Sequence, residues 1–250
     1  MQNGHTSIDK AVDLLEQLAM PPYEYKPAEL AALTGLNRSS VYRLLGVLQA
    51  RELVACDSEG ERYKIGPGLY YVGMKYLYNN NFHSVIQNIL DEISGKIKES
   101  VGLAVRDGER ILSLLEVELH QPMKMNDYPG RYFPVNKGCY GKVLTAYQPP
   151  EVIDRLLQGK TFEKSYPNTL TTREELLAEY AKIRNQGYAY SIDEVCQDAL
   201  GVGIPLLGED GTIRACVAAA FYRTEGWREK MAYFRDVLLE YQPLLEKNMP

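Results

Sequence analysis

The chain has 250 residues, of which 45% are hydrophobic and 24% are charged, and its formal net charge at pH 7 is −5. This composition is typical of folded globular proteins, so it excludes a disordered or collagen-like chain, and the length allows one large domain or two unequal ones. The negative charge argues against a protein that coats nucleic acid without selectivity, although a small DNA-binding region can occur on an acidic protein.

The N-terminus and the cysteines narrow the class further. The start, MQNGHTSIDKAVDLL, lacks the basic residues and continuous apolar run of an export signal, and no apolar stretch is long enough to cross a bilayer. The four cysteines and three histidines show neither CxxC nor HExxH spacing. We therefore predict a cytoplasmic protein with no metal site, no cofactor and no disulfide framework.

The first fifty residues predict three helices. Thr6 and Asp9 have capping-box spacing, and apolar residues then recur at helical spacing until a Pro-Pro pair ends the run. A second, short helix begins at Pro27 and ends at Gly35, where glycine permits the turn. Asn37 can cap a third helix with the sequence RSSVYRLLGVLQA. Two short helices joined by a tight glycine turn predict a helix-turn-helix.

The third helix has an apolar side and a polar side. Its valine and leucines recur at helical spacing and predict a buried stripe. The opposite side carries arginine, serine and tyrosine, which can hydrogen-bond to base edges and phosphates in the major groove of DNA. The alternative is a helix face that contacts only water. The candidate DNA-binding residues of this helix are Arg38, Ser39, Ser40, Tyr42 and Arg43.

The segment VACDSEGERYKI predicts a β-hairpin that completes a winged helix within residues 1–66. Residues 57–60 supply the turn, and Arg62 and Lys64 on the second arm are candidate contacts to DNA phosphates. The acidic residues around the turn could instead hold these two cations in ordinary salt bridges. Residues 1–78 carry eight lysines and arginines against nine aspartates and glutamates, so weak non-specific DNA binding is expected.

The stretch LYYVGMKYLY within residues 67–81 is too apolar for a solvated linker and too short for a domain. We expect a linker helix that packs against a partner chain and joins the winged helix to a second domain, residues 82–250. That domain shows a helix near 83–99 and then a hairpin of VGLAVRD and RILSLLEVEL. Further helices are expected near 141–147, 150–158 and 172–186 and at the C-terminus, with strands near 123–125, 188–191, 202–207 and 213–222. This mixture predicts an α+β fold with helices flanking one sheet.

The glycine-rich segment 136–142, NKGCYGK, allows several interpretations. A phosphate loop is excluded, because Asn136 replaces its leading glycine and Val143 replaces its Ser or Thr. Cys139 could be a nucleophile, but His120 is the only remotely placed partner. Backbone N–H groups at a helix start could bind a carboxylate or another acceptor-rich ligand. The remaining alternative is a tight packing turn without a ligand.

Several segments resemble the IclR family of bacterial regulators. SIDKAVDLLEQL, PAELAALTGLNRSSVYRLLGVLQARELV and ERYKIGPGLYYVG resemble its DNA-binding half, and FPVNKGCYGKVLTAYQP, ELLAEYAKIRNQGYAYSIDE and GVGIP extend the likeness over nearly the whole chain. The resemblance implies a winged helix, a linker helix and a GAF-like α/β effector-binding domain. It also implies a homodimer or dimer of dimers that binds a double-stranded DNA operator under the control of a small effector. The alternatives are an interaction module that does not bind DNA and a Cys139-dependent enzyme.

The chain departs from the family pattern in its effector half, where Asn136 stands at a frequent histidine, Asp198 at a usual glycine and Gly201 at a common cysteine. Methionines are adaptable linings for organic ligands, and acidic side chains accept hydrogen bonds from hydroxyls and amines. We therefore expect a hydroxy, amino or other organic acid, with a neutral polyol or aromatic compound as the alternative. The candidate effector-binding residues are Met123, Met125, Asn136, Gly138, Cys139, Tyr140, Gly141, Asp193, Glu194, Asp198, Ala218 and Ala220.

Overall fold

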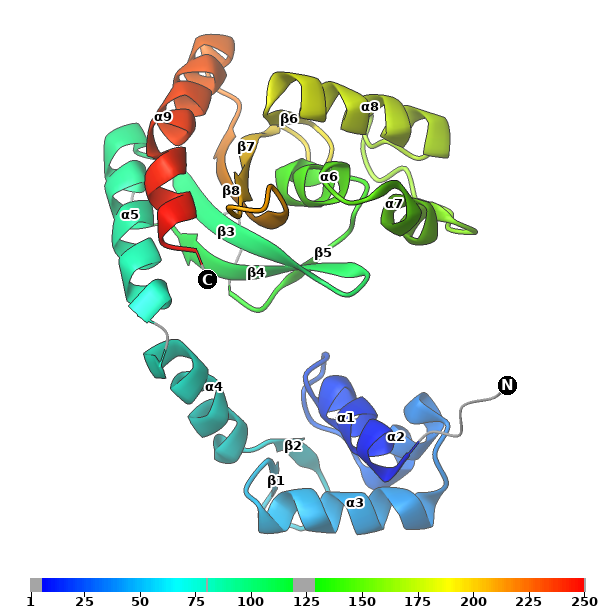
Figure 1. The fold of residues 1–250 in the computed structure, drawn as a ribbon. Helices are drawn as coiled ribbons and strands as arrows, with labels where there is room; N and C mark the ends of the chain where they lie inside the picture. The colour runs from blue at the N-terminus through cyan, green and yellow to red at the C-terminus, as the bar shows by residue number, and fades with distance from the viewer. Residues whose placement is uncertain (1–5, 80, 119–128, 250) are drawn as a thin grey trace. The chain divides into compact units, whose positions relative to one another are not determined.

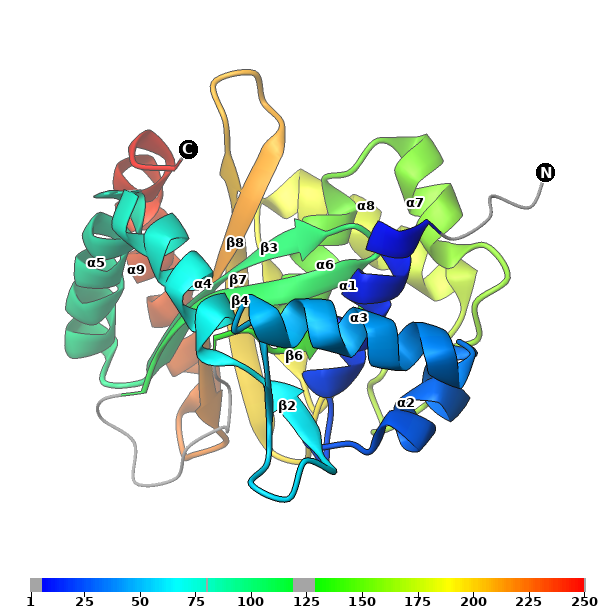
Figure 2. The same cartoon turned by 90° about the horizontal axis from the view of Figure 1, so that it is seen from below.

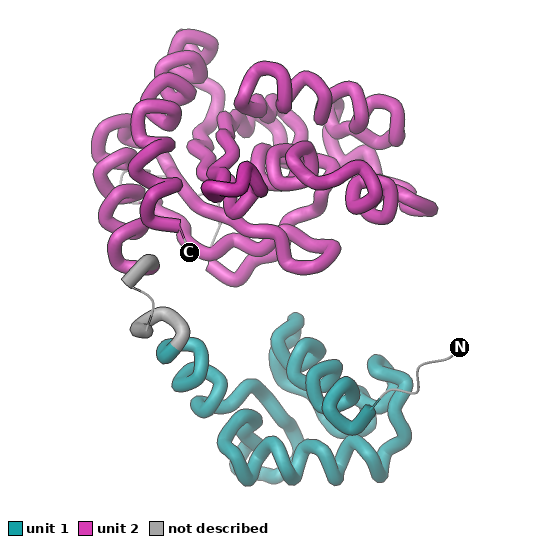
Figure 3. Tube along the Cα trace, viewed as in Figure 1, with its two compact units in different colours: residues 1–81 teal, residues 82–250 magenta. Residues whose placement is uncertain are grey.

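The computed structural model describes residues 6–79, 81–118 and 129–249. The chain divides into two compact units, residues 1–81 and residues 82–250 (Figure 3). The first unit is mostly helical with one hairpin, and the second combines helices with a larger sheet, as Figure 1 shows. The α+β fold that the sequence predicts is confirmed.

The elements of the first unit follow the order of a winged helix. They are α1 (Ser7–Leu18), α2 (Pro27–Thr34), α3 (Arg38–Ala50), β1 (Val54–Cys56), β2 (Tyr63–Ile65) and α4 (Pro67–Asn79). Residues of α1, α2, α3 and β1 form its buried core, and β1 pairs with β2 in an antiparallel hairpin. The helix-turn-helix and its hairpin are thus confirmed as the sequence predicts them.

Local chemistry explains where these helices begin and end. At α1, the Thr6 hydroxyl accepts from the N–H of Asp9 at 3.2 Å, and the Asp9 carboxylate accepts from the N–H of Thr6 at 2.7 Å. Gly35 ends α2 with a φ of 71°, which is costly for residues with a Cβ. Asn37 caps α3, because its Oδ1 accepts from the N–H of Ser40 at 2.8 Å.

Two glycines attach the start of α4 to the hairpin. The Gly66 N–H donates to the carbonyl of Leu53 at 2.9 Å, and the Gly68 N–H donates to that of Glu52 at 2.8 Å. A Cβ on Gly66 would lie 2.3 Å from the carbonyl oxygen of Glu52, so only glycine permits this approach. The sequence GPG therefore fixes how α4 leaves the winged helix.

The second unit is built on one antiparallel sheet. Among the described residues its strand order is β5-β4-β3-β8-β7-β6. Its elements are α5 (Asn81–Ile97), β3 (Ser100–Asp107), β4 (Arg110–Val117), β5 (Tyr132–Phe133), α6 (Gly138–Ala146), α7 (Pro150–Leu157), α8 (Arg173–Gln186), β6 (Ala189–Ile192), β7 (Ala199–Leu207), β8 (Ile213–Tyr222) and α9 (Trp227–Lys247).

Helices cover both faces of this sheet (Figures 1 and 2). Helices α5 and α9 pack on one face, and α6, α7 and α8 pack on the other. Side chains alternate between the faces along a strand. In β3, Val101 and Leu103 belong to the core under α5 and α9, whereas Ala104 belongs to the core under α6. This alternation decides which residues of each strand can face the α6 side.

Most elements predicted for this unit are present, with shifted ends. Helix α6 begins at Gly138 rather than near residue 141, and β7 begins at Ala199 rather than near residue 202. The short strand β5, which pairs with β4, was not expected from the sequence. The strand expected near 123–125 lies outside the described residues.

Candidate nucleic-acid interface and effector pocket

The polar side of α3 lies on the surface of the first unit. Arg38, Ser39, Tyr42 and Arg43 are exposed and Ser40 is half-buried, while the apolar stripe of α3 packs into the core. Tyr42 leaves 58% of its surface accessible, which is high for an aromatic side chain. No acidic residue lies in the first turn of α3, so its positive N-terminal end is not neutralised there. Helix α3 therefore presents hydrogen-bond donors and a positive N-terminal end on the surface of the first unit.

The two wing cations are engaged in salt bridges on the free protein. Lys64 Nζ lies 3.1 Å from a Glu24 carboxylate oxygen, and Arg62 Nη1 lies 3.9 Å from one of Glu29. Both partners come from the start of the α2 region, not from the acidic residues of the hairpin turn. Each side chain in these pairs is at least 41% exposed, so the pairs are weak and a phosphate could replace the carboxylate.

A pocket opens on the α6 side of the second unit. About 650 Å³ of space is free of protein atoms there when the open solvent at its mouth is counted. Strands β3, β4, β7 and β8, the start of α6 and the segment after β6 all contribute to its walls. Glycines and alanines make up much of its wall, among them Gly201, Ala218 and Ala220.

Three acceptor groups at the adjoining ends of β3 and β4 reach this pocket, namely Ser100, Glu116 and Glu118. The Tyr140 hydroxyl lies 3.1 Å from Glu116 Oε1 and donates to that carboxylate. A Cβ on Gly102 would lie 2.0 Å from Glu116 Oε2, so this glycine makes room for the Glu116 side chain. None of these three acceptors is among the residues predicted from the sequence. In β4 the acids alternate with Leu115 and Val117, a pattern that ordinarily indicates a solvated face, and helix α6 covers that face here.

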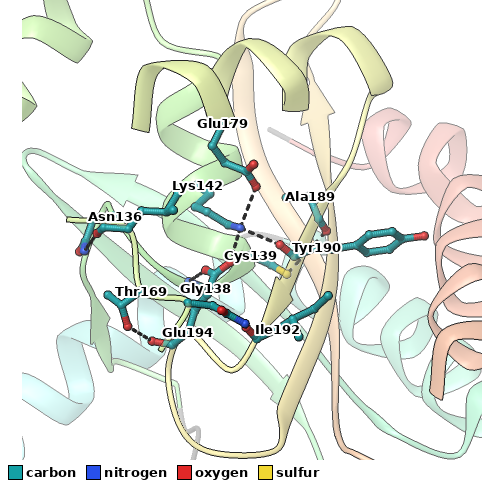
Figure 4. Close-up of polar contacts among 12 residues, drawn as sticks. Asn136, Gly138, Cys139, Lys142, Thr169, Glu179, Ala189, Tyr190, Ile192 and Glu194 are labelled. Carbon is teal, nitrogen blue, oxygen red and sulfur yellow. Dashed lines mark hydrogen bonds and ion pairs between the residues drawn. The ribbon is translucent and has the colours of Figure 1, made fainter. Parts of the chain in front are cut away.

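A buried cation joins the start of α6 to the segment after β6 (Figure 4). Lys142 is 1% exposed, and its ammonium lies 2.6 Å from Glu194 Oε1 and 2.9 Å from Glu179 Oε1. It also donates to the carbonyl of Tyr190 at 2.6 Å. Burial alone would lower the pKa of Lys142, but the carboxylates of Glu194 and Glu179 outweigh it and hold that pKa above its usual range.

The other oxygen of Glu194 reaches the helix start. Glu194 Oε2 accepts from the backbone N–H of Gly138 at 2.9 Å, and the Thr169 hydroxyl donates to the Glu194 carbonyl at 2.7 Å. An internal carboxylate thus occupies the N–H of Gly138, which is one of the candidate effector-binding residues. Lys142 was not among the candidate residues, because a lone lysine in a helix gives no indication that it is buried.

The structure brings five of the twelve candidate effector residues to the pocket wall: Gly138, Cys139, Tyr140, Ala218 and Ala220. Asn136 is buried beside the pocket and donates to the carbonyl of Leu170 at 2.8 Å. Gly141 is a packing glycine, since a Cβ there would lie 2.1 Å from the carbonyl oxygen of Pro134. Met123 and Met125 lie outside the described residues.

The remaining acids of the candidate set do not line the pocket. Asp193 and Asp198 both pair with Arg223, and the Arg223 Nε to Asp198 Oδ1 distance is 3.1 Å. Glu194 is directed to Lys142 and Gly138 instead. The Asp198 carboxylate pairs with Arg223 instead of lining this pocket, and its contact with a ligand stays a prediction.

Cys139 does not have the surroundings of a nucleophile. Burial raises the pKa of its thiol to about 12, and its Sγ lies 3.7 Å from the carbonyl oxygen of Ala189. Within the described residues, no group of three or more His, Cys, Asp or Glu side chains is placed to hold a metal ion. In the same part of the chain, no helix is long and apolar enough to cross a membrane.

Comparison with known proteins gives matches over nearly the whole length. The model of the IclR helix-turn-helix domain matches residues 7–58, and that of the bacterial transcriptional regulator IclR C-terminal domain matches residues 74–241. The HTH-type transcriptional regulator XynR of Escherichia coli (strain K12) is 25% identical over 232 residues, which cover 93% of this chain and 92% of XynR.

Solved structures share the fold. An IclR-type transcriptional regulator from Silicibacter sp. TM1040 superposes with a TM-score of 0.88 at 22% identity, covering 98% of this chain and 100% of that one. An IclR homolog from Microbacterium hydrocarbonoxydans, complexed with 4-hydroxybenzoate, has a TM-score of 0.81 at 18% identity and covers 97% and 100%. At these identities the likeness shows the fold alone.

Proposed function

Because the chain belongs to the IclR family of bacterial DNA-binding transcriptional regulators, we propose that its helix α3 reads a DNA operator and that a small organic effector controls this binding. The exposed polar side of α3 is the observation that carries the first half of the proposal. A helix of this kind fits the major groove, where arginine makes bidentate contacts to guanine and serine contacts bases or phosphates.

We assign base contacts to the exposed residues of α3 and a place close to the DNA backbone to Ser40. The exposed residues are Arg38, Ser39, Tyr42 and Arg43. The wing residues Arg62 and Lys64 would leave their exposed carboxylate partners and contact DNA phosphates instead. Phosphate contacts position the protein without reading sequence, so selectivity depends on α3.

The pocket on the α6 side of the second unit supports effector control. It is concave, mostly lined by small and apolar side chains, and carries a few convergent polar groups, as small-molecule sites do. The solved IclR homolog complexed with 4-hydroxybenzoate binds an organic acid. For this chain we propose an effector among hydroxy, amino or other organic acids, which would favour one of two arrangements of the reading helices and so repress or activate transcription.

We further propose that the protein acts as a homodimer or a dimer of dimers in the cytoplasm, where its operator lies. Helix α4 exposes Tyr70, Tyr71 and Val72 in the single chain, with 72%, 63% and 57% of their surfaces accessible. Such an apolar surface on a connecting helix is what contact with a second copy would cover. Two copies would read an inverted repeat with half-sites spaced by whole helical turns of about 10 base pairs.

The two alternatives from the sequence are not supported. The matched relatives are transcriptional regulators, which disfavours an enzyme, and the raised thiol pKa disfavours Cys139 as a nucleophile. The family's DNA-binding role disfavours a helix-turn-helix that serves only protein interactions.

In vitro selection from random DNA, followed by footprinting, tests the proposed function. We expect protection of an inverted repeat and release or tightening of that complex by members of an organic-acid, amino-acid and polyol library. No selected sequence at low salt would contradict operator binding. Selected DNA with no response to any compound would contradict effector control.

A further inference from the structure

Resting on the proposed function, we propose that the effector bears an amine, whose ammonium group binds Glu118, Ser100 and Glu116 at one end of the pocket. The inference begins from two oxygen atoms that lack a hydrogen-bond partner among the residues the structure describes. These are Ser100 Oγ and Glu118 Oε1, both shielded from solvent and both belonging to residues of the pocket wall. Ser100 is 5% exposed.

The two groups belong to one cross-strand neighbourhood. In the β3–β4 ladder Val101 pairs with Val117 and Gly102 pairs with Glu116, so the same register brings Ser100 opposite Glu118. Residues 100, 102, 116 and 118 all share the α6 side of the sheet, because Val101 and Val117 face α5 and α9. The pocket therefore has a hydroxyl and two carboxylates gathered at the adjoining ends of two strands.

Buried oxygens of this kind require donors. An unpaired buried acceptor costs free energy, and a carboxylate costs more than a neutral group. Glu116 already accepts from the Tyr140 hydroxyl at 3.1 Å, whereas Glu118 Oε1 and Ser100 Oγ have no such donor among the described residues. An ammonium group supplies three N–H donors and a positive charge, so it can serve both orphaned oxygens and the Glu116 carboxylate together.

The charge of the pocket wall disfavours a simple anion. Among the residues that the structure describes, two carboxylates line it against one ammonium group, that of Lys137, which donates to the Ser165 hydroxyl at 2.8 Å. The first N–H of α6, at Gly138, is occupied by Glu194. A ligand carboxylate can therefore approach Lys137 and the remaining N–H groups of the helix start, but not the Glu116 and Glu118 end.

The rest of the pocket wall is suited to a ligand whose remaining part is short and apolar. Phe133 and Tyr140 meet edge to face with ring centroids 5.4 Å apart, and both line the pocket. Ala220 and Ala218 also line it, and they pair with Ser100 and Gly102 in the β3–β8 ladder. The preferred effector is thus a compact amine, including an amino acid whose ammonium and carboxylate are separated by a few carbons.

Two matched probe series test this inference by calorimetry on the full chain. The first is 4-aminobutyrate, 4-hydroxybutyrate and succinate, and the second is benzylamine, benzyl alcohol and benzoate. Within at least one series the amine should bind about tenfold or more tightly than the alcohol and the acid, since only the amine makes charge-assisted bonds to the carboxylates. Equal or tighter binding of the alcohol or acid, or no binding of either amine, overturns the inference.

Variants show whether the amine binds where we assign it. Glu118→Gln keeps the shape of the side chain and removes its charge. It should therefore lower the affinity for the amine by about 10- to 100-fold, while the affinity for the matched alcohol should change less than about threefold. Glu151→Gln, an exposed carboxylate at the start of α7, is the matched control and should change neither. Ser100→Ala serves as a second variant if Glu118→Gln proves unstable. Unchanged amine affinity in the Glu118 or Ser100 variant overturns the assignment.

Failure of this inference and failure of the proposed function are distinguishable. Selective operator binding that responds only to an acid or a neutral compound leaves the proposed function intact and makes the amine inference wrong. Absence of selective operator binding makes the proposed function wrong, whichever compounds bind the pocket.

Discussion

The backbone N–H of Gly138 donates to the Glu194 carboxylate at 2.9 Å, and the same carboxylate holds the buried ammonium of Lys142. One acid thus caps the helix that bounds the pocket and neutralises a cation inside the fold. Gly138 lines the pocket and Glu194 does not, so this contact stabilises the pocket wall without contributing to its lining.

The first prediction concerns this buried pair. Lys142→Met should lower the free energy of unfolding by about 3–5 kcal/mol, because Glu194 would remain buried without its partner cation. Urea denaturation followed by circular dichroism measures the change. Lys160→Met is the control, since Lys160 pairs with Glu109 on the surface, and it should cost no more than about 1 kcal/mol. Equal losses in the two variants would show that the Lys142 pair is not specially important.

The second prediction concerns thiol reactivity. The pKa of Cys139 is about 12, so at pH 8 only about one thiol in ten thousand is ionised. Iodoacetamide should therefore modify the half-buried Cys56 and Cys196 well before Cys139. The Cys139 rate should rise about tenfold per pH unit from pH 8 to 10 without levelling, because the thiolate is the reactive form. Mass spectrometry of the alkylated peptides follows each site, and a plateau for Cys139 below pH 10 would indicate an activated thiol.

The winged helix could be predicted well because its determinants are local. The Thr6–Asp9 capping box, Gly35 and Asn37 each act within a few residues, and the structure realises all of them. The hairpin turn has the same property, since the side chain of Asp57 accepts from the N–H of Glu61 at 2.8 Å. Short-range hydrogen bonding of this kind is readable from sequence order alone.

The pocket could be predicted only in part because its polar contacts are non-local. Lys142 meets Glu194 across 52 positions, and Tyr140 meets Glu116 across 24. Asp198 was expected to bind a ligand, yet its carboxylate accepts a hydrogen bond from Arg223, 25 positions away. Sequence order indicates that the start of α6 bounds a site, but the pairing of side chains depends on strand order and register, which propensity does not fix.

The third prediction concerns operator reading. Arg43→Ala should weaken binding to the selected operator by about 10- to 100-fold, in line with the loss of about 1–3 kcal/mol expected for a base-reading arginine. Ser39→Ala should also lower selectivity, because Ser39 lies about one turn away on the same exposed side. Lys182→Ala removes a positive charge from the exposed side of α8 and serves as the control. Footprints with unchanged operator preference in both α3 variants would contradict the assignment.

The fourth prediction concerns the exposed part of α4. Replacing Tyr71 and Val72 together with lysine should give monomers in analytical ultracentrifugation, because two charges would enter the proposed contact between copies. Operator affinity should fall with the loss of the dimer, since each copy reads one half-site. Tyr233→Lys, at an exposed position of α9, is the control and should leave the oligomer unchanged. An intact dimer of full affinity would place the contact elsewhere.

The last prediction concerns Asp198, which the sequence nominated as a determinant of ligand choice. The structure gives it a φ of 60° and a 3.1 Å ion pair with Arg223, and 54% of its side chain is exposed. In Asp198→Gly the lost surface pair costs up to about 1 kcal/mol, while glycine relieves the left-handed backbone by a similar amount. Stability should therefore change by less than about 1 kcal/mol, and Arg223 keeps its second partner, Asp193.

Because neither acid lines the pocket, the ranking of ligands by calorimetry should match the wild type, in contrast to Glu118→Gln. A changed ranking in Asp198→Gly with an unchanged one in Glu118→Gln would move the ligand from the β3–β4 end of the pocket to the 193–198 loop.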